Sequence, residues 1–273
     1  MVKKLFKHEF LAYTRIMGIV YIILLTVAAA GRVVQLFEDD SLSYSIVSTI
    51  SFITYGVSIG AALGFTTVLA IVRFYKNLFT AEGYLSFTLP VTATQHILVK
   101  AVTAVTMTVA TLVAVMLSVS VITAGEVLVE IWKAVAYLLG KAYEVIGIHT
   151  AVIGVELVIL LLAAFFSGLL LYYTFISIGQ LFKKNRILSA VGAYFAWYIF
   201  TQIISTIFLV VFSVFASTEA FQRMIQRLGN FVMAHPYVFI HSCIWIAIAL
   251  TAVFTLVEFL IIRRIITRKL NLE

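Results

Sequence analysis

The side chains best suited to chemistry in this 273-residue chain are its histidines and the glutamates that interrupt apolar runs. Clustered histidines can hold a metal ion, and an intramembrane carboxylate can carry a proton. The five histidines are scattered along the sequence: His8, His96, His149, His235 and His241. Because just His235 and His241 are near neighbours in sequence, the spacing predicts no metal site.

Signatures of two common enzyme classes are incomplete. Gly140-Lys141 lacks both the upstream glycine and the following hydroxyl residue of a nucleotide-binding phosphate loop. His8-Glu9 lacks the second histidine that a zinc protease places at helical spacing. We therefore predict that the chain is not an enzyme by itself, and we expect no catalytic residue and no cofactor in it.

Two glutamates, Glu156 and Glu258, lie within apolar segments. An unpaired charge there costs at least ~2.5 kcal/mol, so each needs a partner. Arg263 and Arg264 follow Glu258 closely and are its expected ion-pair partners. Glu156 lies near the outer end of its segment, where a basic surface residue is the expected partner. A role for Glu156 as the proton site of a carrier is the alternative.

The composition is that of a membrane protein. Hydrophobic residues make up 63% of the chain and charged residues 11%, whereas soluble domains carry about 25% charge. Six apolar segments are each long enough to cross a bilayer, which takes about 20 residues. They lie at about 16–37, 42–73, 97–125, 147–182, 187–217 and 237–264. Backbone groups in lipid must bond within their own segment, so the prediction is one all-α, polytopic transmembrane domain over residues 1–273.

The basic residues predict the orientation. Most lie at the two ends of the chain and in alternate connections, whereas the other connections are acidic on balance. Cytoplasmic loops are rich in Lys and Arg, so both termini are expected in the cytoplasm. The net charge of +7 is therefore a topology signal, and no nucleic-acid partner is expected.

Three further segments are amphipathic and are expected to lie along the membrane surface. They are an N-terminal interfacial helix at 1–14 and two outer segments at 126–146 and 219–235. Apolar residues recur at helical spacing in each, opposite a charged face, which is typical of interfacial helices. Packing against neighbouring helices is the alternative for each stripe.

The cytoplasmic connection 74–92 is the most informative segment. Its first part predicts a short amphipathic helix that ends at Gly83, because glycine readily adopts the left-handed conformation after a helix. Thr92 followed by Gln95 matches a capping box that begins the third span. Apolar residues surround Glu82, and an exposed apolar surface of this kind usually marks a partner. Contact with lipid head groups is the alternative.

The run Phe74 to Thr92, FYKNLFTAEGYLSFTLPVT, resembles the permease subunits of bacterial type-2 ABC transporters. The six-span plan and the surface helix before the first span are also similar to that family. The resemblance implies a coupling helix that docks on a separate ATP-binding subunit, formed by Asn77, Leu78, Phe79, Thr80, Ala81, Glu82 and Gly83. The outer segment 126–146 is less typical of the family.

The same resemblance implies the assembly and its location. Two ATP-binding subunits would supply ATP and Mg, and a second permease subunit, identical or homologous, would complete the path. The complex would export an amphipathic substrate, such as a peptide, drug or lipid, across the bacterial cytoplasmic membrane.

Three glycines, Gly56, Gly60 and Gly64, share one face of the second span and allow close helix packing, within the subunit or at a dimer seam. Two alternatives to an exporter subunit stay open: a proton-coupled secondary transporter, or an immunity or receptor-like protein that binds a peptide at the outer surface through 126–146.

Overall fold

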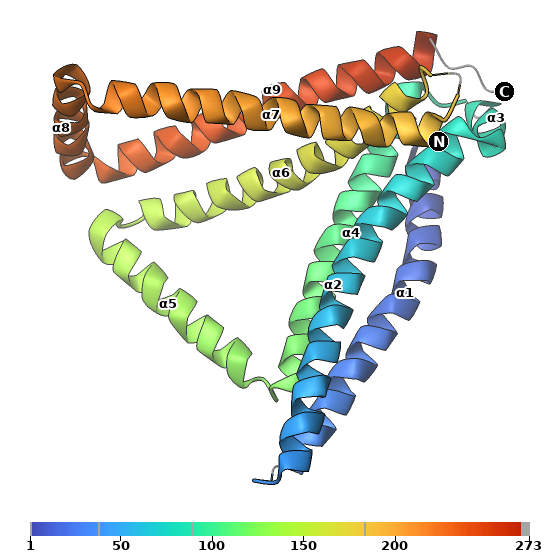
Figure 1. Ribbon diagram of the computed structural model, residues 1–273, viewed down its shortest axis with the longest axis horizontal. Coiled ribbons are helices and arrows are strands. Elements are labelled where there is room, and N and C mark those ends of the chain that lie inside the picture. Colours follow the sequence, from blue (N-terminus) through green and yellow to red (C-terminus); the bar gives the residue numbers. More distant parts are fainter. Residues whose placement is uncertain (1, 38, 89, 183, 269–273) are drawn as a thin grey trace. The chain divides into compact units, whose positions relative to one another are not determined.

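The computed structural model describes residues 2–37, 39–88, 90–182 and 184–268. Over these residues the chain forms nine α-helices and no strand (Figure 1). The helices are α1 Val2–Gln35, α2 Leu42–Phe79, α3 Ala81–Thr88, α4 Ala93–Ile122, α5 Glu126–Ile146, α6 His149–Gly179, α7 Arg186–Ala216, α8 Glu219–Ala234 and α9 Pro236–Arg268.

Six of these helices, α1, α2, α4, α6, α7 and α9, are long and apolar enough to span a membrane. This confirms the predicted all-α, multi-pass architecture. The first helix is continuous from Val2 to Gln35, so no break separates the segments predicted at 1–14 and 16–37. At about 1.5 Å per residue, α1 is about 50 Å long and exceeds a hydrocarbon core of about 30 Å.

The helix α5 coincides with the amphipathic segment predicted at 126–146. Glycines with positive φ flank it, at +84° for Gly125 and +59° for Gly147. The Gly125 amide donates to the carbonyl oxygen of Ser120 at 2.8 Å, which satisfies an otherwise free acceptor at the end of α4. Residues that carry a side chain rarely adopt a positive φ, so these two glycines mark the two ends of α5.

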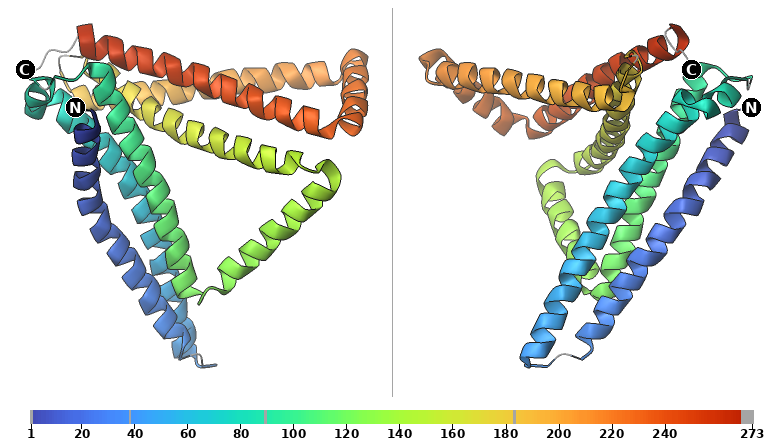
Figure 2. Two further views of the ribbon diagram at one scale, coloured as in Figure 1. Left: turned by 180° about the vertical axis from the view of Figure 1, so that it is seen from behind. Right: turned by 45° about the vertical axis from the view of Figure 1, so that its right-hand side comes forward.

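The chain divides into two compact units, and the boundary falls within α5. In the N-terminal unit, residues 1–140, the helices α1, α2 and α4 lie side by side (Figure 2). Their core contains Leu24, Ala28, Tyr55, Ala62 and Ile122. Gly31 allows the close approach, because a Cβ atom there would lie 2.9 Å from Ile122 Cδ1.

Buried hydroxyl groups cross-link the three helices of the N-terminal unit. Tyr13 Oη donates to the carbonyl oxygen of Thr66 at 3.1 Å, and Thr66 Oγ1 lies 2.9 Å from Thr111 Oγ1. Tyr21 Oη lies 2.8 Å from Thr111 Oγ1. Hydrogen bonds between membrane helices contribute on average about 0.6 kcal/mol each, so these bonds fix the register of the helices more than they add stability.

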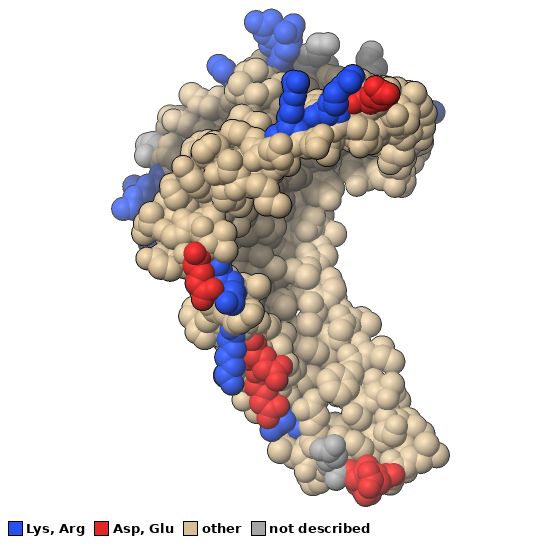
Figure 3. All heavy atoms as spheres, turned by 90° about the vertical axis from the view of Figure 1, so that its left-hand side faces the viewer, with Lys and Arg blue, Asp and Glu red and all other residues tan. Residues whose placement is uncertain are grey.

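In the C-terminal unit, residues 141–271, α6 packs against both α7 and α9. Phe221 of α8 contacts Phe212 and Phe215 of α7 edge-on, at ring-centroid distances of 5.3 and 5.5 Å. No residue of α7 is buried, and its exposed side chains are mainly large and apolar. On the face that Figure 3 shows in space-filling view, charged side chains are few and gather in clusters. Such surfaces suit a lipid environment.

The turn between α6 and α7 requires glycine at position 179. A Cβ atom there would lie 2.6 Å from the carbonyl oxygen of Arg186 and 2.7 Å from Ala190 Cβ.

We expect Gly179→Ala to destabilise the C-terminal unit by about 1–3 kcal/mol, because the backbone must move apart. Gly168→Ala, on the same helix with no atom within 4 Å of the added carbon, is the matched control. Thermal unfolding in detergent compares them, and equal stabilities would contradict the close approach.

Candidate functional site

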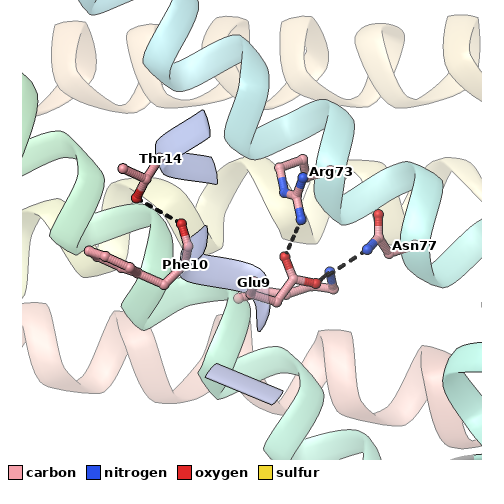
Figure 4. Close-up of polar contacts among 6 residues, drawn as sticks. Glu9, Phe10, Thr14, Arg73 and Asn77 are labelled. Carbon is pink, nitrogen blue, oxygen red and sulfur yellow. Dashed lines mark hydrogen bonds and ion pairs between the residues drawn. The ribbon is translucent and has the colours of Figure 1, made fainter. Parts of the chain in front are cut away.

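The carboxylate of Glu9 collects donors from two other helices of the N-terminal unit (Figure 4). Arg73 Nη2 of α2 donates to Glu9 Oε2 at 2.6 Å. Lys100 Nζ of α4 donates to Oε1 at 2.6 Å, and Asn77 Nδ2 of α2 donates to the same oxygen at 3.2 Å. One side chain of α1 therefore holds the ends of α2 and α4 together.

This ionic cluster (Glu9, Arg73, Asn77 and Lys100) is buried. The side chains of Glu9 and Lys100 are 9% and 6% exposed, and that of Arg73 is 18% exposed. Arg73 also lies over the ring of Tyr13, with its guanidinium carbon 5.6 Å from the ring centroid. The cluster contains two cations and one carboxylate, so loss of the carboxylate would leave two buried charges without compensation.

The cluster is connected to the short helix α3 through α2. Helix α3 packs against α2, and Arg73 and Asn77 of the cluster lie near the end of α2 that precedes α3. His96, one helical turn before Lys100 on α4, is 2% exposed. The position of α3 is thus linked to the helix end that Glu9 holds.

The predicted docking residues divide between buried and exposed positions. Asn77, Leu78 and Phe79 form the last turn of α2, where Leu78 and Phe79 are 0% and 4% exposed. Thr80 is the C-cap of α2. Ala81, Glu82 and Gly83 begin α3, and of these Ala81 and Glu82 are exposed whereas Gly83 is buried.

Exposed apolar surface continues on α3 beyond the predicted segment. Tyr84 is 54% exposed and Leu85 is 73% exposed. The surface available to another protein is therefore formed by Ala81, Glu82, Tyr84 and Leu85, which we call the α3 surface. Docking itself stays a prediction.

The prediction that Gly83 ends a helix is wrong. The break comes three residues earlier, at Thr80, whose φ and ψ of −114° and −171° are extended. The Gly83 amide then donates to the Thr80 carbonyl oxygen at 2.7 Å, so Gly83 lies in the first turn of a new helix. The predicted capping box is confirmed, because Thr92 Oγ1 accepts from the Gln95 amide and the Gln95 side chain accepts from the Thr92 amide.

The glycine face of α2 is open. A Cβ atom at Gly56, Gly60 or Gly64 would meet nothing within 4 Å. The segment Gly56-Val57-Ser58-Ile59-Gly60 fits the Gly-x-Ser-x-Gly pattern of serine hydrolases, but it lies within a helix, without the strand-to-helix turn of a nucleophile elbow. Ser58 Oγ donates to the Tyr55 carbonyl oxygen at 2.7 Å, as a helical serine commonly does.

The intramembrane glutamates have different partners from those predicted. Ser167 Oγ donates to Glu258 Oε2 at 3.5 Å, and the described salt bridges include no pair with Arg263 or Arg264. At 3.6 residues per turn, residues five or six positions apart point more than about 90° from each other, which explains the error.

Glu156 is paired within the C-terminal unit rather than with a surface residue. Its Oε2 lies 2.8 Å from His241 Nδ1, and Trp245 Nε1 donates to its Oε1 at 2.9 Å. His235 does not join this group; its ring lies 5.5 Å from that of Phe231. Over the described residues, no three or more His, Cys, Asp or Glu side chains are arranged so that they could hold a metal ion.

Sequence reasoning did not identify Glu9 as a functional residue. Its partners follow it by 64 and 91 positions, so no local pattern shows the contact. One signal was available: Glu9 is the single acid among the basic residues that precede the first apolar segment.

Compared with protein-family models, curated proteins and solved structures, the chain gives no match.

We expect Glu9→Gln to destabilise the protein by about 3–5 kcal/mol, because it leaves Lys100 and Arg73 as uncompensated buried cations. Adding Lys100→Met to Glu9→Gln should restore part of that loss. Glu144→Gln is the control, because its ion pair with Lys141 is exposed and should contribute under about 1 kcal/mol. Denaturation in detergent measures each variant, and additive losses in the double variant would contradict the coupling.

Proposed function

We propose that this chain is the membrane-spanning permease subunit of an ATP-driven exporter of the ABC class. It would move an amphipathic substrate, such as a peptide, drug or lipid, across the bacterial cytoplasmic membrane. The observation that carries the proposal is an exposed short helix, α3, that packs against α2, which a buried ionic cluster joins to α1 and α4.

The α3 surface suits a protein partner that moves. Its apolar residues, Tyr84 and Leu85, supply contact area, and Glu82 supplies a charge for a basic partner residue. Helix α3 packs against α2, and α2 carries Arg73 and Asn77 of the ionic cluster. A displacement of α3 would therefore pass first to α2.

The ionic cluster supports transmission to the other spans. Lys100 joins α4 to Glu9 of α1, and Glu9 in turn holds Arg73 of α2. Charge-assisted hydrogen bonds are short and strong, so the three helix ends would move together. Lys3, Lys4 and Lys7 begin α1 near this cluster in sequence, which by the positive-inside rule assigns this end to the cytoplasm.

The energy source in this proposal is another chain. The sequence contains no complete nucleotide-binding phosphate loop, so two ATP-binding subunits would bind ATP and Mg and act on the α3 surface of two permease subunits. A proton-coupled carrier is the competing function. It differs in that its transport survives ATP depletion and collapses with the proton gradient.

Purification from native membranes should recover an ATP-binding subunit, recognised by the sequence of its phosphate loop and by its ATPase activity. Glu82→Lys or Leu85→Asp should lower its recovery about tenfold, which corresponds to about 1.4 kcal/mol of binding. Glu130→Lys, which reverses an exposed charge on α5, is the control. A chain that purifies alone and transports in ATP-free vesicles would refute the proposal.

A further inference from the structure

A second polar cluster joins α6 and α9 at the ends where both helices begin. Tyr237, His241 and Trp245 follow one another at four-residue spacing and share one face of α9. That face meets His149 and Glu156 of α6, which are two turns apart. The cluster of His149, Glu156, His241 and Trp245 lies wholly within the C-terminal unit.

His241 is the centre of the cluster because both of its ring nitrogens are used. Nδ1 lies 2.8 Å from Glu156 Oε2, and Nε2 lies 3.3 Å from His149 Nδ1. The His149 ring stacks on Tyr237, with ring centroids 4.4 Å apart and planes at 11°. Carboxylate and both imidazoles thus form one continuous hydrogen-bonded chain that starts near the helix ends.

Because the cluster is buried, its charge must be compensated within the cluster. The Glu156 side chain is 8% exposed, and within the described residues its one ion-pair partner is His241. A carboxylate inside an apolar span is costly unless its charge is compensated. The cluster is therefore neutral when His241 is an imidazolium, which donates from Nδ1 to Glu156 and from Nε2 to His149.

No other ionisable side chain of the packed helices compensates the charge of Glu156. The charged residues of α8 are exposed: Glu219 lies 3.7 Å from Arg223, and Arg227 is also exposed. Cys243 lies between His241 and Trp245 in sequence but is exposed. The others lie elsewhere along their helices: Arg186, Tyr194 and Tyr198 of α7, and Glu258, Arg263, Arg264 and Arg268 of α9. Near the end of α5, Lys141 pairs with Glu144, and Tyr237 at the start of α9 stacks its ring on His149.

A further proton would change the geometry. The bond between the histidines requires a lone pair on one of the two facing nitrogens. If His149 also becomes an imidazolium, both nitrogens carry hydrogens, and the bond becomes a contact between two donors and two cations. His149 is the first residue of α6, where the positive end of the helix dipole also opposes a cation.

We propose that Glu156, His241 and His149 form a proton-binding site that holds the starts of α6 and α9 together at neutral pH and releases them on acidification. One proton from the aqueous phase adds to the lone pair of His149 Nδ1, breaks its bond to His241 Nε2, and separates the two helix starts. By the predicted topology this end faces the outside, so the site responds to external acid. The proposal does not depend on the ABC function.

Trp245 is a built-in reporter, because its indole donates to Glu156. With Trp132→Phe and Trp197→Phe as background, the full chain in lipid nanodiscs should show one transition in Trp245 emission between pH 8 and 5, the range in which histidine changes charge. The transition should be lost in His149→Asn and unchanged in the control His235→Asn. Glu156→Gln should move its midpoint about one pH unit or more towards acid, because the counter-charge is gone.

A second measurement needs no change in the cluster. Spin labels at Val152 and Ile240, exposed positions on α6 and α9, placed in a Cys243→Ser background, should report a longer distance at pH 5 than at pH 8. An unchanged distance, emission that is independent of pH, or a transition that persists in His149→Asn would overturn the proposal. A transition produced at constant pH by Zn²⁺ and reversed by EDTA would identify a metal site instead and would also overturn it.

Discussion

The N-terminal unit depends on one carboxylate that is shared by three donors. In a bilayer, apolar helices gain little by touching one another, because lipid tails are as apolar as leucine side chains. Interhelical polar contacts therefore have a large influence on which helices associate and in which register. Glu9 supplies the strongest such contact, because Arg73 and Lys100 come from two different helices and neither has another described carboxylate partner.

Hydrogen bonds of buried hydroxyl groups extend the contact that the ionic cluster makes between the helices. They connect Tyr13 to Thr66, Thr66 to Thr111 and Thr111 to Tyr21 at the interface of α1, α2 and α4. Further along the interface, Tyr55 Oη lies 2.8 Å from Ser118 Oγ. Each link is weak, but each specifies one longitudinal position of the helices. Together with the close approach at Gly31, they favour a unit that moves as one body when its charged end is displaced.

In the C-terminal unit, the polar groups that join the helices are a carboxylate and two imidazoles, shared between α6 and α9. In the N-terminal unit they are a carboxylate, a guanidinium and an ammonium group. Guanidinium and ammonium groups keep their charge across the physiological pH range, whereas imidazole does not. The first contact is therefore suited to permanent mechanical linkage, and the second to a linkage that depends on conditions.

The sequence alone determined the elements that obey local rules. Apolar length predicted six spans, helical spacing predicted α5 at its observed bounds, and the Thr92–Gln95 pattern predicted the start of α4. Local rules failed at Gly83, because the extended backbone of Thr80 ended the helix before the glycine was reached. They also failed at Glu258, because neighbours in sequence point to different sides of a helix.

The tertiary structure alone decided which polar groups meet. Glu9 bonds to residues 64 and 91 positions away, and Glu156 to a residue 85 positions away, so no sequence window contains either site. It also decided that Leu78 and Phe79 are buried whereas Leu85 is exposed, although all three are apolar residues of one connection. The physical reason is the same in each case: hydropathy and capping act within a helix, whereas charge compensation and burial depend on which helices pack together.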